Sequence, residues 1–236
     1  MTPPLAVTFD CWNTLFWPND AVQRARARRL APWLRAPEEA VHSALVDGFE
    51  RHSAEWRAGR CWGTRDLAQA LLDRFPADGR HARRDELAEL IEISGVGADE
   101  RPVEGSLEVV EELRRAGVRV GIISDTGFSP GRVLRGFLSR AGLLDRFEPA
   151  ALTFSDEVGV PKPNPRIFRA ALEALCAEPS QAVHVGDLRA TDVAGARAVR
   201  MRSVRFMGCH NDGSDGPEAD VVISRLTDLP PALGMP

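Results

Sequence analysis

The stretch Val7-Thr-Phe-Asp-Cys-Trp-Asn-Thr-Leu15 decides how the rest of the chain is interpreted. It starts as a short run of β-branched and aromatic residues, and this run ends at Asp10. The pattern predicts a buried first strand, from about Leu5 to Asp10, with the acid at its carboxyl end. Ligands of open α/β sheets bind at that edge, so we interpret Asp10 as a candidate functional residue, although an acid that starts a turn is also common.

Composition narrows the class of protein. The 236 residues are 44% hydrophobic and carry a net charge of -4, which supports a large core and argues against nucleic acid or an anionic membrane as the main partner. No apolar run approaches the length of a membrane span, and the first residues lack the regions of a signal peptide. The four cysteines are scattered and fit reduced thiols. We therefore expect a cytoplasmic protein.

The region after the first strand has a helical pattern throughout. Apolar residues recur at helical spacing in segments that begin near Ala21, Pro37, Thr64 and Asp85. Because no strand pattern interrupts these four segments, they predict a helical bundle that forms its own domain, residues 19–96.

Strands and helices alternate in the second half of the chain. Buried strands are expected at 118–124, 150–154, 182–186 and 203–206, with helices at 106–116, 131–141, 165–175 and 192–199. This alternation predicts an α/β fold with a doubly wound, parallel, Rossmann-like sheet. The helical domain is inserted after the first strand, so the core domain comprises residues 1–18 and 97–236.

Four polar motifs stand at the expected carboxyl ends of these strands. They are Asp10-Cys-Trp-Asn-Thr14, Ser124-Asp-Thr126, Lys162-Pro163, and Gly186-Asp187 followed by Asp192. Lys162 is the only lysine among the 30 Lys and Arg residues, which favours a position where a compact ammonium is required. The order and spacing of the motifs resemble the haloacid dehalogenase superfamily of hydrolases, and the inserted helices resemble that superfamily's four-helix, type-1 cap.

The resemblance implies a chemistry for the first and last motifs. Asp10 matches the family's nucleophile, which attacks a phosphoryl group and forms an aspartyl-phosphate intermediate. Asp10, Asp187 and the backbone carbonyl of Trp12 match its Mg²⁺ ligands, and Asp192 completes or braces that site. Lys162 matches the cation that neutralises the nucleophile and the transferred group.

The remaining motif residues are expected to contact the substrate. Thr14 and Ser124 match the groups that hold the phosphoryl oxygens or orient the nucleophile. We expect Trp12, Asp125 and Thr126 to line the substrate site, and Asp125 is also a candidate for a second catalytic acid. The predicted substrate is a small phosphorylated metabolite, and the expected assembly is a monomer or a homodimer.

Trp12 departs from the family's phosphatases, which carry a second Asp two residues after the nucleophile. That Asp protonates the leaving group and then activates water, which contributes about 10²- to 10⁴-fold in rate. The family's 2-haloacid dehalogenases instead have an aromatic residue there and work without a metal, but they lack the acids at Asp187 and Asp192. Three hypotheses follow: a Mg²⁺-dependent phosphohydrolase, which we favour, a dehalogenase-like hydrolase, and a non-catalytic descendant that binds a phosphorylated metabolite or a protein.

One further histidine and one further cluster of polar residues are expected to have structural roles only. His184 is expected to pack within its strand. Cys209, His210, Asp212 and Asp215 lie in a Gly-rich segment whose spacing fits no zinc pattern, so a flexible surface loop is predicted there.

Overall fold

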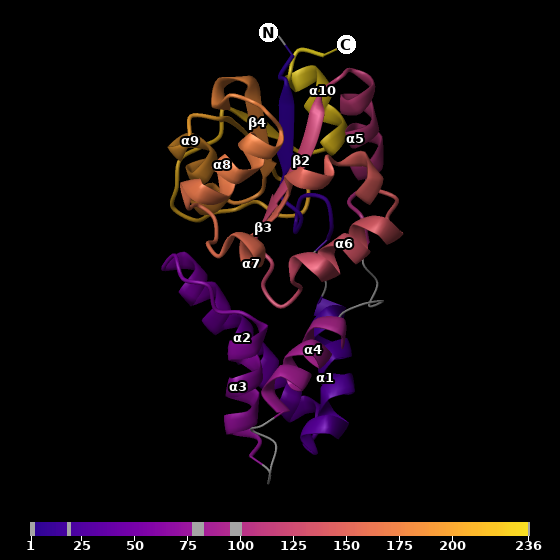
Figure 1. The fold of residues 1–236 in the computed structure, drawn as a ribbon, viewed down its shortest axis with the longest axis vertical. Coiled ribbons are helices and arrows are strands. Elements are labelled where there is room, and N and C mark those ends of the chain that lie inside the picture. The colour runs from indigo at the N-terminus through magenta and orange to yellow at the C-terminus, as the bar shows by residue number, and fades with distance from the viewer. Residues whose placement is uncertain (1–2, 18–19, 77–82, 95–100, 236) are drawn as a thin grey trace. The chain divides into compact units, whose positions relative to one another are not determined.

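The structure is a computed structural model that describes residues 3–17, 20–76, 83–94 and 101–235 (Figure 1). The chain divides into two compact units. We call Met1–Pro18, Arg101–Asp125 and Leu138–Pro236 the sheet unit, and Asn19–Glu100 with Thr126–Phe137 the helical unit.

The sheet unit is built on a six-stranded sheet in which every neighbouring pair is parallel. Its strands are β1 (Ala6–Phe9), β2 (Arg119–Ser124), β3 (Leu152–Phe154), β4 (Ala182–Gly186), β5 (Arg202–Phe206) and β6 (Val221–Ile223). Their order in the sheet is β3-β2-β1-β4-β5-β6, so β1 lies between β2 and β4. Because parallel strands end at the same edge, the residues that follow β1, β2 and β4 are brought together.

Helices cover both faces of this sheet, as the predicted doubly wound fold requires. They are α5 (Ser106–Arg115), α7 (Ser155–Val158), α8 (Pro165–Ala174), α9 (Ala194–Ala198) and α10 (Leu229–Ala232). A further helix, α6 (Gly131–Arg140), lies mostly in the segment that is grouped with the helical unit. In Figure 1, α8 and α9 lie on one side of the strands, and α5 and α10 lie on the other. The apolar stripe of α8, which includes Phe168 and Leu172, is buried in one continuous core with residues of β1, β2 and β4.

Two elements of the sheet unit differ from the prediction. The strand β6 was not expected, because only three residues pair with β5 and the middle one, Val222, is 40% exposed. The helix expected at 192–199 begins earlier, as a π-helical segment over Arg189–Val193 that continues into α9. The wider turn of that segment contains Asp192, and such π-helical turns are frequent at functional sites.

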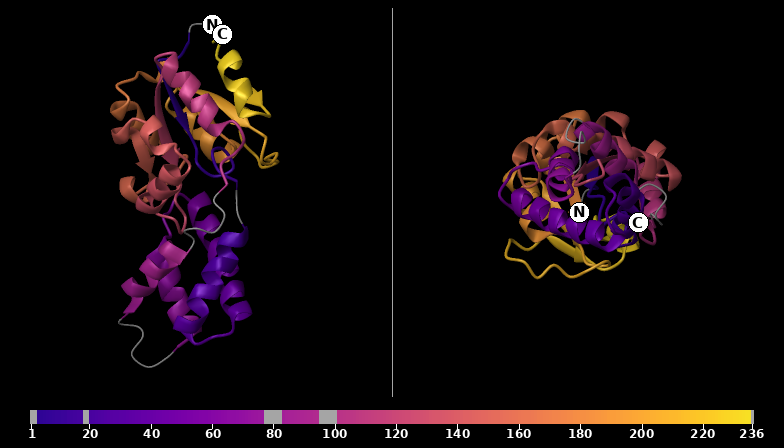
Figure 2. Two further views of the ribbon diagram at one scale, coloured as in Figure 1. Left: turned by 90° about the vertical axis from the view of Figure 1, so that its right-hand side faces the viewer. Right: turned by 90° about the horizontal axis from the view of Figure 1, so that it is seen from below.

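The helical unit contains the four expected helices, side by side in a bundle (Figures 1 and 2). They are α1 (Asp20–Leu34), α2 (Glu38–Arg57), α3 (Thr64–Arg74) and α4 (Arg84–Ser94). Their facing apolar stripes form one buried cluster that includes Leu30, Leu45, Leu71 and Ile91. Among the helices of the described residues, none is both long and apolar enough to cross a membrane.

The segment Thr126–Phe137 also belongs to the helical unit by its contacts. Phe128 is buried in the helical core, and its ring lies 6.0 Å from that of Trp62 in an edge-on arrangement. Arg26 of α1 is buried and donates hydrogen bonds to the Phe128 carbonyl at 3.0 Å and to the Ser129 hydroxyl at 2.9 Å. The sequence did not indicate this grouping. The predicted domain boundaries at 18/19 and 96/97 lie outside the described residues and stay predictions.

Candidate active site

Asp10 is fixed at the carboxyl end of β1. Its backbone N–H donates to the Val185 carbonyl of β4 at 2.8 Å, and its side chain is buried. The chain then turns tightly, because the N–H groups of Leu15 and Phe16 both donate to the Cys11 carbonyl at 2.9 Å. The turn contains Thr14, which is fully buried and whose hydroxyl has no hydrogen-bond partner among the described residues.

Lys162 supplies the cation of the site. Its ammonium nitrogen lies 2.6 Å from Asp10 Oδ1 and 2.6 Å from Asp192 Oδ1, and the side chain is 3% exposed. Its backbone N–H donates to Asp125 Oδ1 at 3.1 Å. Because Lys162 lies between α7 and α8 while Asp125 follows β2, this bond joins two of the predicted motifs directly.

The last motif contributes two buried acids. Asp187 follows β4, and Asp192 turns back toward it from the π-helical segment. Asp192 Oδ2 accepts the N–H of Leu188 at 3.0 Å. A side chain at Gly186 would overlap the carboxyl group of Asp192, so only glycine allows this close approach.

His184 is a site residue that the sequence analysis assigned to packing alone. Its Nε2 lies 2.9 Å from Asp192 Oδ1, and its Nδ1 lies 2.9 Å from the Thr8 hydroxyl. Burial lowers the pKa of His184, which favours a neutral ring. A neutral ring donates from only one nitrogen, and a carboxylate can only accept, so Nε2–H donates to Asp192 and Nδ1 accepts from Thr8. A histidine inside an apolar strand gave no sequence signal for this role.

Burial and crowding of the acids shift their ionisation. Burial, and then the charges of Asp192 and Asp10, raise the pKa of Asp187 to about 9. Burial raises the pKa of Asp10 to about 7, although the Lys162 ammonium opposes this. Burial also raises the pKa of Asp192. The charge of Lys162 and the hydrogen bond from His184 outweigh this effect and hold the pKa of Asp192 below its usual range. Burial alone would lower the pKa of Lys162, and the surrounding carboxylates raise it well above its usual value.

The donor set fits a hard divalent cation. Carboxylate oxygens of Asp10, Asp187 and Asp192 all lie within 4.8 Å of one another, and all three residues are buried. Asp187 Oδ2 has no hydrogen-bond partner among the described residues. Three buried carboxylates share the single ammonium of Lys162, so a divalent cation would balance the excess negative charge, and oxygen ligands are those that Mg²⁺ and Ca²⁺ prefer.

The other predicted residues lie in different settings. Ser124 is fully buried at the end of β2, and its hydroxyl donates to the Asp125 carbonyl at 3.2 Å. Trp12 is half-buried, with its ring 6.5 Å from that of Phe16. Thr126 is buried but belongs to the helical unit, so its predicted contact with the substrate stays a prediction.

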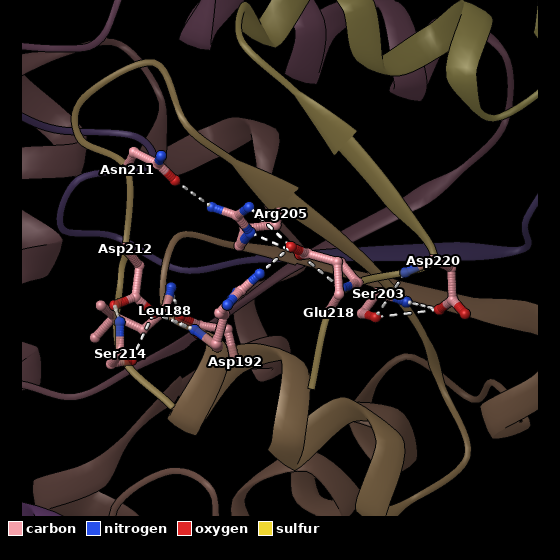
Figure 3. A network of polar contacts seen from close by, with 11 residues as sticks. Leu188, Asp192, Ser203, Arg205, Asn211, Asp212, Ser214, Glu218 and Asp220 are labelled. Atoms are coloured by element: carbon pink, nitrogen blue, oxygen red, sulfur yellow. Dashed lines mark hydrogen bonds and ion pairs between the residues drawn. The ribbon is translucent and has the colours of Figure 1, made fainter. Parts of the chain in front are cut away.

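The segment predicted as a flexible surface loop is anchored to the site. Asp212 is buried, and its Oδ2 accepts the backbone N–H of Arg189 at 2.7 Å. Glu218 pairs with the guanidinium groups of both Arg189 and Arg205. Figure 3 shows Glu218 beside Arg205. Within this loop His210 Nδ1 lies 3.4 Å from Asp187 Oδ2, a contact that the spacing of the segment did not reveal.

The sequence is similar to those of known proteins. A sequence model described as haloacid dehalogenase-like hydrolase matches residues 4–200. Haloacid dehalogenase-like hydrolase domain-containing protein 3 of Mus musculus is 35% identical over 136 residues, 56% of this chain and 52% of that protein. The match thus spans about half the length of that relative. Phosphoglycolate phosphatase of Rhodospirillum rubrum is 34% identical over 202 residues, 83% of this chain and 76% of that protein.

Solved structures share the fold along the whole chain. A HAD phosphatase from Thermococcus onnurineus has a TM-score of 0.68 and is 25% identical in sequence. The superposition covers 97% of this chain and 97% of that one. A 2-haloacid dehalogenase from Pseudomonas syringae has a TM-score of 0.71 at 24% identity with the same coverage, a likeness of fold alone. With the family match and the motif geometry, these findings lead to one assignment: the chain belongs to the haloacid dehalogenase-like hydrolases.

Proposed function

We propose that the protein is a Mg²⁺-dependent phosphohydrolase that acts on a small phosphorylated metabolite through an aspartyl-phosphate intermediate. The observation that carries this proposal is the 2.6 Å contact between Lys162 Nζ and Asp10 Oδ1. The ammonium opposes the rise in the pKa of Asp10 that burial causes and positions its carboxyl group at the sheet edge, which is what a carboxylate nucleophile requires.

The reaction has two displacements. An oxygen of Asp10 attacks phosphorus, the bond between phosphorus and the leaving oxygen breaks, and the leaving group takes a proton from solvent water. A second water then attacks the same phosphorus and gives up a proton to solvent, the bond between phosphorus and the Asp10 oxygen breaks, and inorganic phosphate and the Asp10 carboxylate are released. Each displacement is easier than direct attack of water on the ester.

The chain's own groups would assist in distinct ways. Lys162 would offset negative charge on both Asp10 and the phosphoryl oxygens. The Thr14 hydroxyl, buried without a hydrogen-bond partner among the described residues, is available to a phosphoryl oxygen, and Ser124 is proposed to act beside it.

Asp10, Asp187 and the Trp12 carbonyl are the residues that would hold Mg²⁺, with Asp192 bracing the site. The bound ion would supply positive charge between two anionic reactants, the nucleophile and the phosphoryl group. Asp192 already accepts bonds from Lys162, His184 and Leu188, so its main contribution would be to fix Lys162.

Trp12 sets the expected substrate range. Without an acid at this position the leaving group must depart with little protonation, so activated esters and acyl phosphates should react best. Asp125, in the second motif, is a candidate for the replacement acid. Its Oδ1 accepts the backbone N–H of Lys162. Relatives whose names describe their substrates include phosphatases of phosphoglycolate, phosphoserine and glyceraldehyde 3-phosphate and a pyrimidine 5'-nucleotidase. These names favour a small phosphorylated metabolite here as well.

A dehalogenase-like reaction is the second candidate, because Trp12 places an aromatic residue where the family's dehalogenases have one. The buried acids Asp187 and Asp192 argue against it, since the family's dehalogenases lack acids at these positions. A descendant that only binds a phosphorylated metabolite or a protein is the third. We propose the cytoplasm as the protein's compartment, as the scattered cysteines of the sequence predict.

A hydrolysis panel tests the proposal. It contains p-nitrophenyl phosphate, acetyl phosphate, phosphoglycolate, phosphoserine and 2-chloropropionate, each with Mg²⁺ or with EDTA, and the Asp10→Asn variant is the control. Phosphate release that requires both Mg²⁺ and Asp10 is the expected result. Chloride release that is unaffected by EDTA would support the dehalogenase instead, and no turnover of any substrate would favour the binding protein.

A further inference from the structure

Asp212 is a buried carboxylate that lies outside the acid cluster but is bonded to the last motif. It is 8% exposed, and its Oδ2 accepts the backbone N–H of Arg189 at 2.7 Å. Ser214 donates its N–H to Asp212 Oδ1 and its hydroxyl to Asp212 Oδ2, each at 2.9 Å (Figure 3). Both carboxylate oxygens therefore accept hydrogen bonds, which fixes the orientation of Asp212 toward Arg189.

The bond to Arg189 acts on the short stretch of backbone that joins the two acids of the last motif. Two consecutive N–H groups follow Asp187, and each donates to a different carboxylate. The Leu188 N–H donates to Asp192 Oδ2 at 3.0 Å, and the Arg189 N–H donates to Asp212 Oδ2 at 2.7 Å. Because the first N–H groups of a helix lack acceptors within it, Asp212 supplies the acceptor at the start of the π-helical segment. These two bonds fix the backbone directly after Asp187.

The loop that carries Asp212 also packs closely on this backbone. A Cβ atom at Gly216 would lie 3.0 Å from the carbonyl carbon of Arg189 and 3.1 Å from the nitrogen of Ala190, so glycine permits the close approach. Glu218, at the end of the loop, pairs with the Arg189 guanidinium. The loop is therefore attached to the start of the π-helical segment, and Asp212 supplies the hydrogen bond to its backbone.

Asp187 depends on this backbone more than its neighbour in the cluster does. The carboxylate of Asp192 accepts hydrogen bonds from Lys162, His184 and Leu188. By contrast, Asp187 Oδ2 has no hydrogen-bond partner among the described residues. The position of Asp187 is therefore set mainly by the backbone that carries it.

From these contacts we propose that Asp212 is a positioning residue for the metal site. By fixing the backbone after Asp187, it holds that carboxylate within reach of the same ion as Asp10 and so strengthens the binding of Mg²⁺. The inference rests on the metal site in the proposed function. Mg²⁺ demands near-ideal octahedral geometry, so a displaced carboxylate weakens its binding.

The test compares the natural full chain with Asp212→Ala and Asp212→Asn. Calorimetric titration with Mg²⁺ should give a dissociation constant about 10-fold higher for Asp212→Ala. Asp212→Asn keeps an oxygen that can accept the Arg189 N–H, so its Mg²⁺ affinity should stay within about 3-fold of the natural value. Because Asp212 acts through the metal site, saturating Mg²⁺ should bring the kcat of Asp212→Ala to within about 3-fold of the natural kcat. An equal loss of affinity in Asp212→Asn and Asp212→Ala would contradict a role through this hydrogen bond.

A second pair of variants removes the donor instead of the acceptor, and it decides the question even if Asp212→Ala does not fold. Arg189→Pro removes the N–H itself. Proline suits the first position of a helix, and Leu188 has the extended backbone that a following proline requires, with φ -97° and ψ 128°. Arg189→Ala is the matched control, because it removes the same side chain but keeps the N–H. Mg²⁺ binding should weaken by about 10-fold in Arg189→Pro and by less than about 3-fold in Arg189→Ala.

Two further variants separate the possible failures. Asn211→Ala removes the acceptor of the Arg205 bond in the same loop and should bind Mg²⁺ as the natural chain does. If Asp187→Asn weakens Mg²⁺ binding but Asp212→Ala and Arg189→Pro do not, the Asp212 inference is wrong while the metal site stands. If Asn211→Ala or Arg189→Ala weakens binding as much as Arg189→Pro, the specific role of Asp212 is wrong. If Asp187→Asn changes no affinity, both the metal site and the Asp212 inference are wrong.

Discussion

The ammonium nitrogen of Lys162 lies 2.6 Å from the Oδ1 atom of Asp10, and both side chains are almost fully buried. The same nitrogen lies 2.6 Å from Asp192 Oδ1. One cation therefore serves two carboxylates, and the Asp187 carboxyl belongs to the same cluster. The cluster therefore contains more buried carboxyl groups than its single ammonium can neutralise.

Loss of the Lys162 ammonium should destabilise the protein and abolish its activity. In Lys162→Met the buried acids lose their compensating charge, so we expect the metal-free protein to lose about 3–5 kcal/mol of unfolding free energy in urea titrations. Lys162→Arg keeps a charge and should be less destabilised, but it should remain inactive because the planar guanidinium does not replace a compact ammonium. Equal stability of Lys162→Met and the natural chain would contradict this account of the site.

His184 should act on catalysis through Asp192. His184→Phe keeps the ring volume but removes the Nε2–H that donates to Asp192 Oδ1 at 2.9 Å. Because Asp192 then holds Lys162 less firmly, kcat should fall about 10- to 100-fold with a smaller change in KM. His184→Gln, whose amide can donate in the same direction, should restore part of the rate. A loss of thermal stability in His184→Phe without a change in kcat would show that the histidine only packs.

Trp12→Asp should increase the rate on poor leaving groups. An acid at this position would protonate the leaving oxygen, so hydrolysis of alkyl phosphates should rise by about 10²-fold, whereas p-nitrophenyl phosphate, which needs little protonation, should gain much less. Trp12→Phe is the matched control and should gain nothing. If the two variants gave the same rates on both kinds of ester, the missing acid would not be what limits the natural enzyme.

Stability of the metal-free protein should fall as pH rises from about 7 to about 9. Asp187 has a pKa of about 9 in the folded state, against about 3.9 in the unfolded chain. In that window the folded state holds a proton that the unfolded state has released, so the free energy of unfolding decreases with pH, by on the order of 1 kcal/mol per unit. Asp10, with a folded pKa of about 7, adds to this decline only at the low end of the window.

Other groups with shifted pKa values affect the stability only at pH values outside this range. The lowered pKa of Asp192 gives stability that is lost only below about pH 4, and the raised pKa of Lys162 gives stability that is lost only above about pH 10. Urea titrations across the window should therefore show a clear slope for the natural chain, a much smaller one for Asp187→Asn, and a smaller one with saturating Mg²⁺. The same slope in Asp187→Asn would assign the effect to another group.

The sheet and most of the acid site follow from the sequence because parallel strands end at one edge. Once Asp10, Ser124 and Asp187 are placed after three buried strands, the topology brings them together without any knowledge of side chains. Lys162 was identifiable because it is the only lysine in a chain rich in arginine. Its pairing with both Asp10 and Asp192 depends on three-dimensional packing and needed the structure.

What the sequence did not reveal depends on contacts between distant segments. His184 lies within a fully buried strand, where an imidazole is as compatible with packing as with hydrogen bonding. His210 lies in a polar, Gly-rich segment, and contacts such as the bond from Arg189 to Asp212 are needed to show that this segment is attached to the site. The grouping of Thr126–Phe137 with the helices likewise depends on the burial of Phe128 among them.

The most direct test of the central claim is to look for phosphate on Asp10. The protein would be mixed with acetyl phosphate and Mg²⁺, quenched in acid within milliseconds, and digested for mass spectrometry. The account predicts a hydroxylamine-sensitive acyl phosphate on the peptide that contains Asp10, formed only with the metal and absent from Asp10→Asn. Mg²⁺-dependent phosphate release that persists in Asp10→Asn, with no phosphorylated peptide, would contradict it.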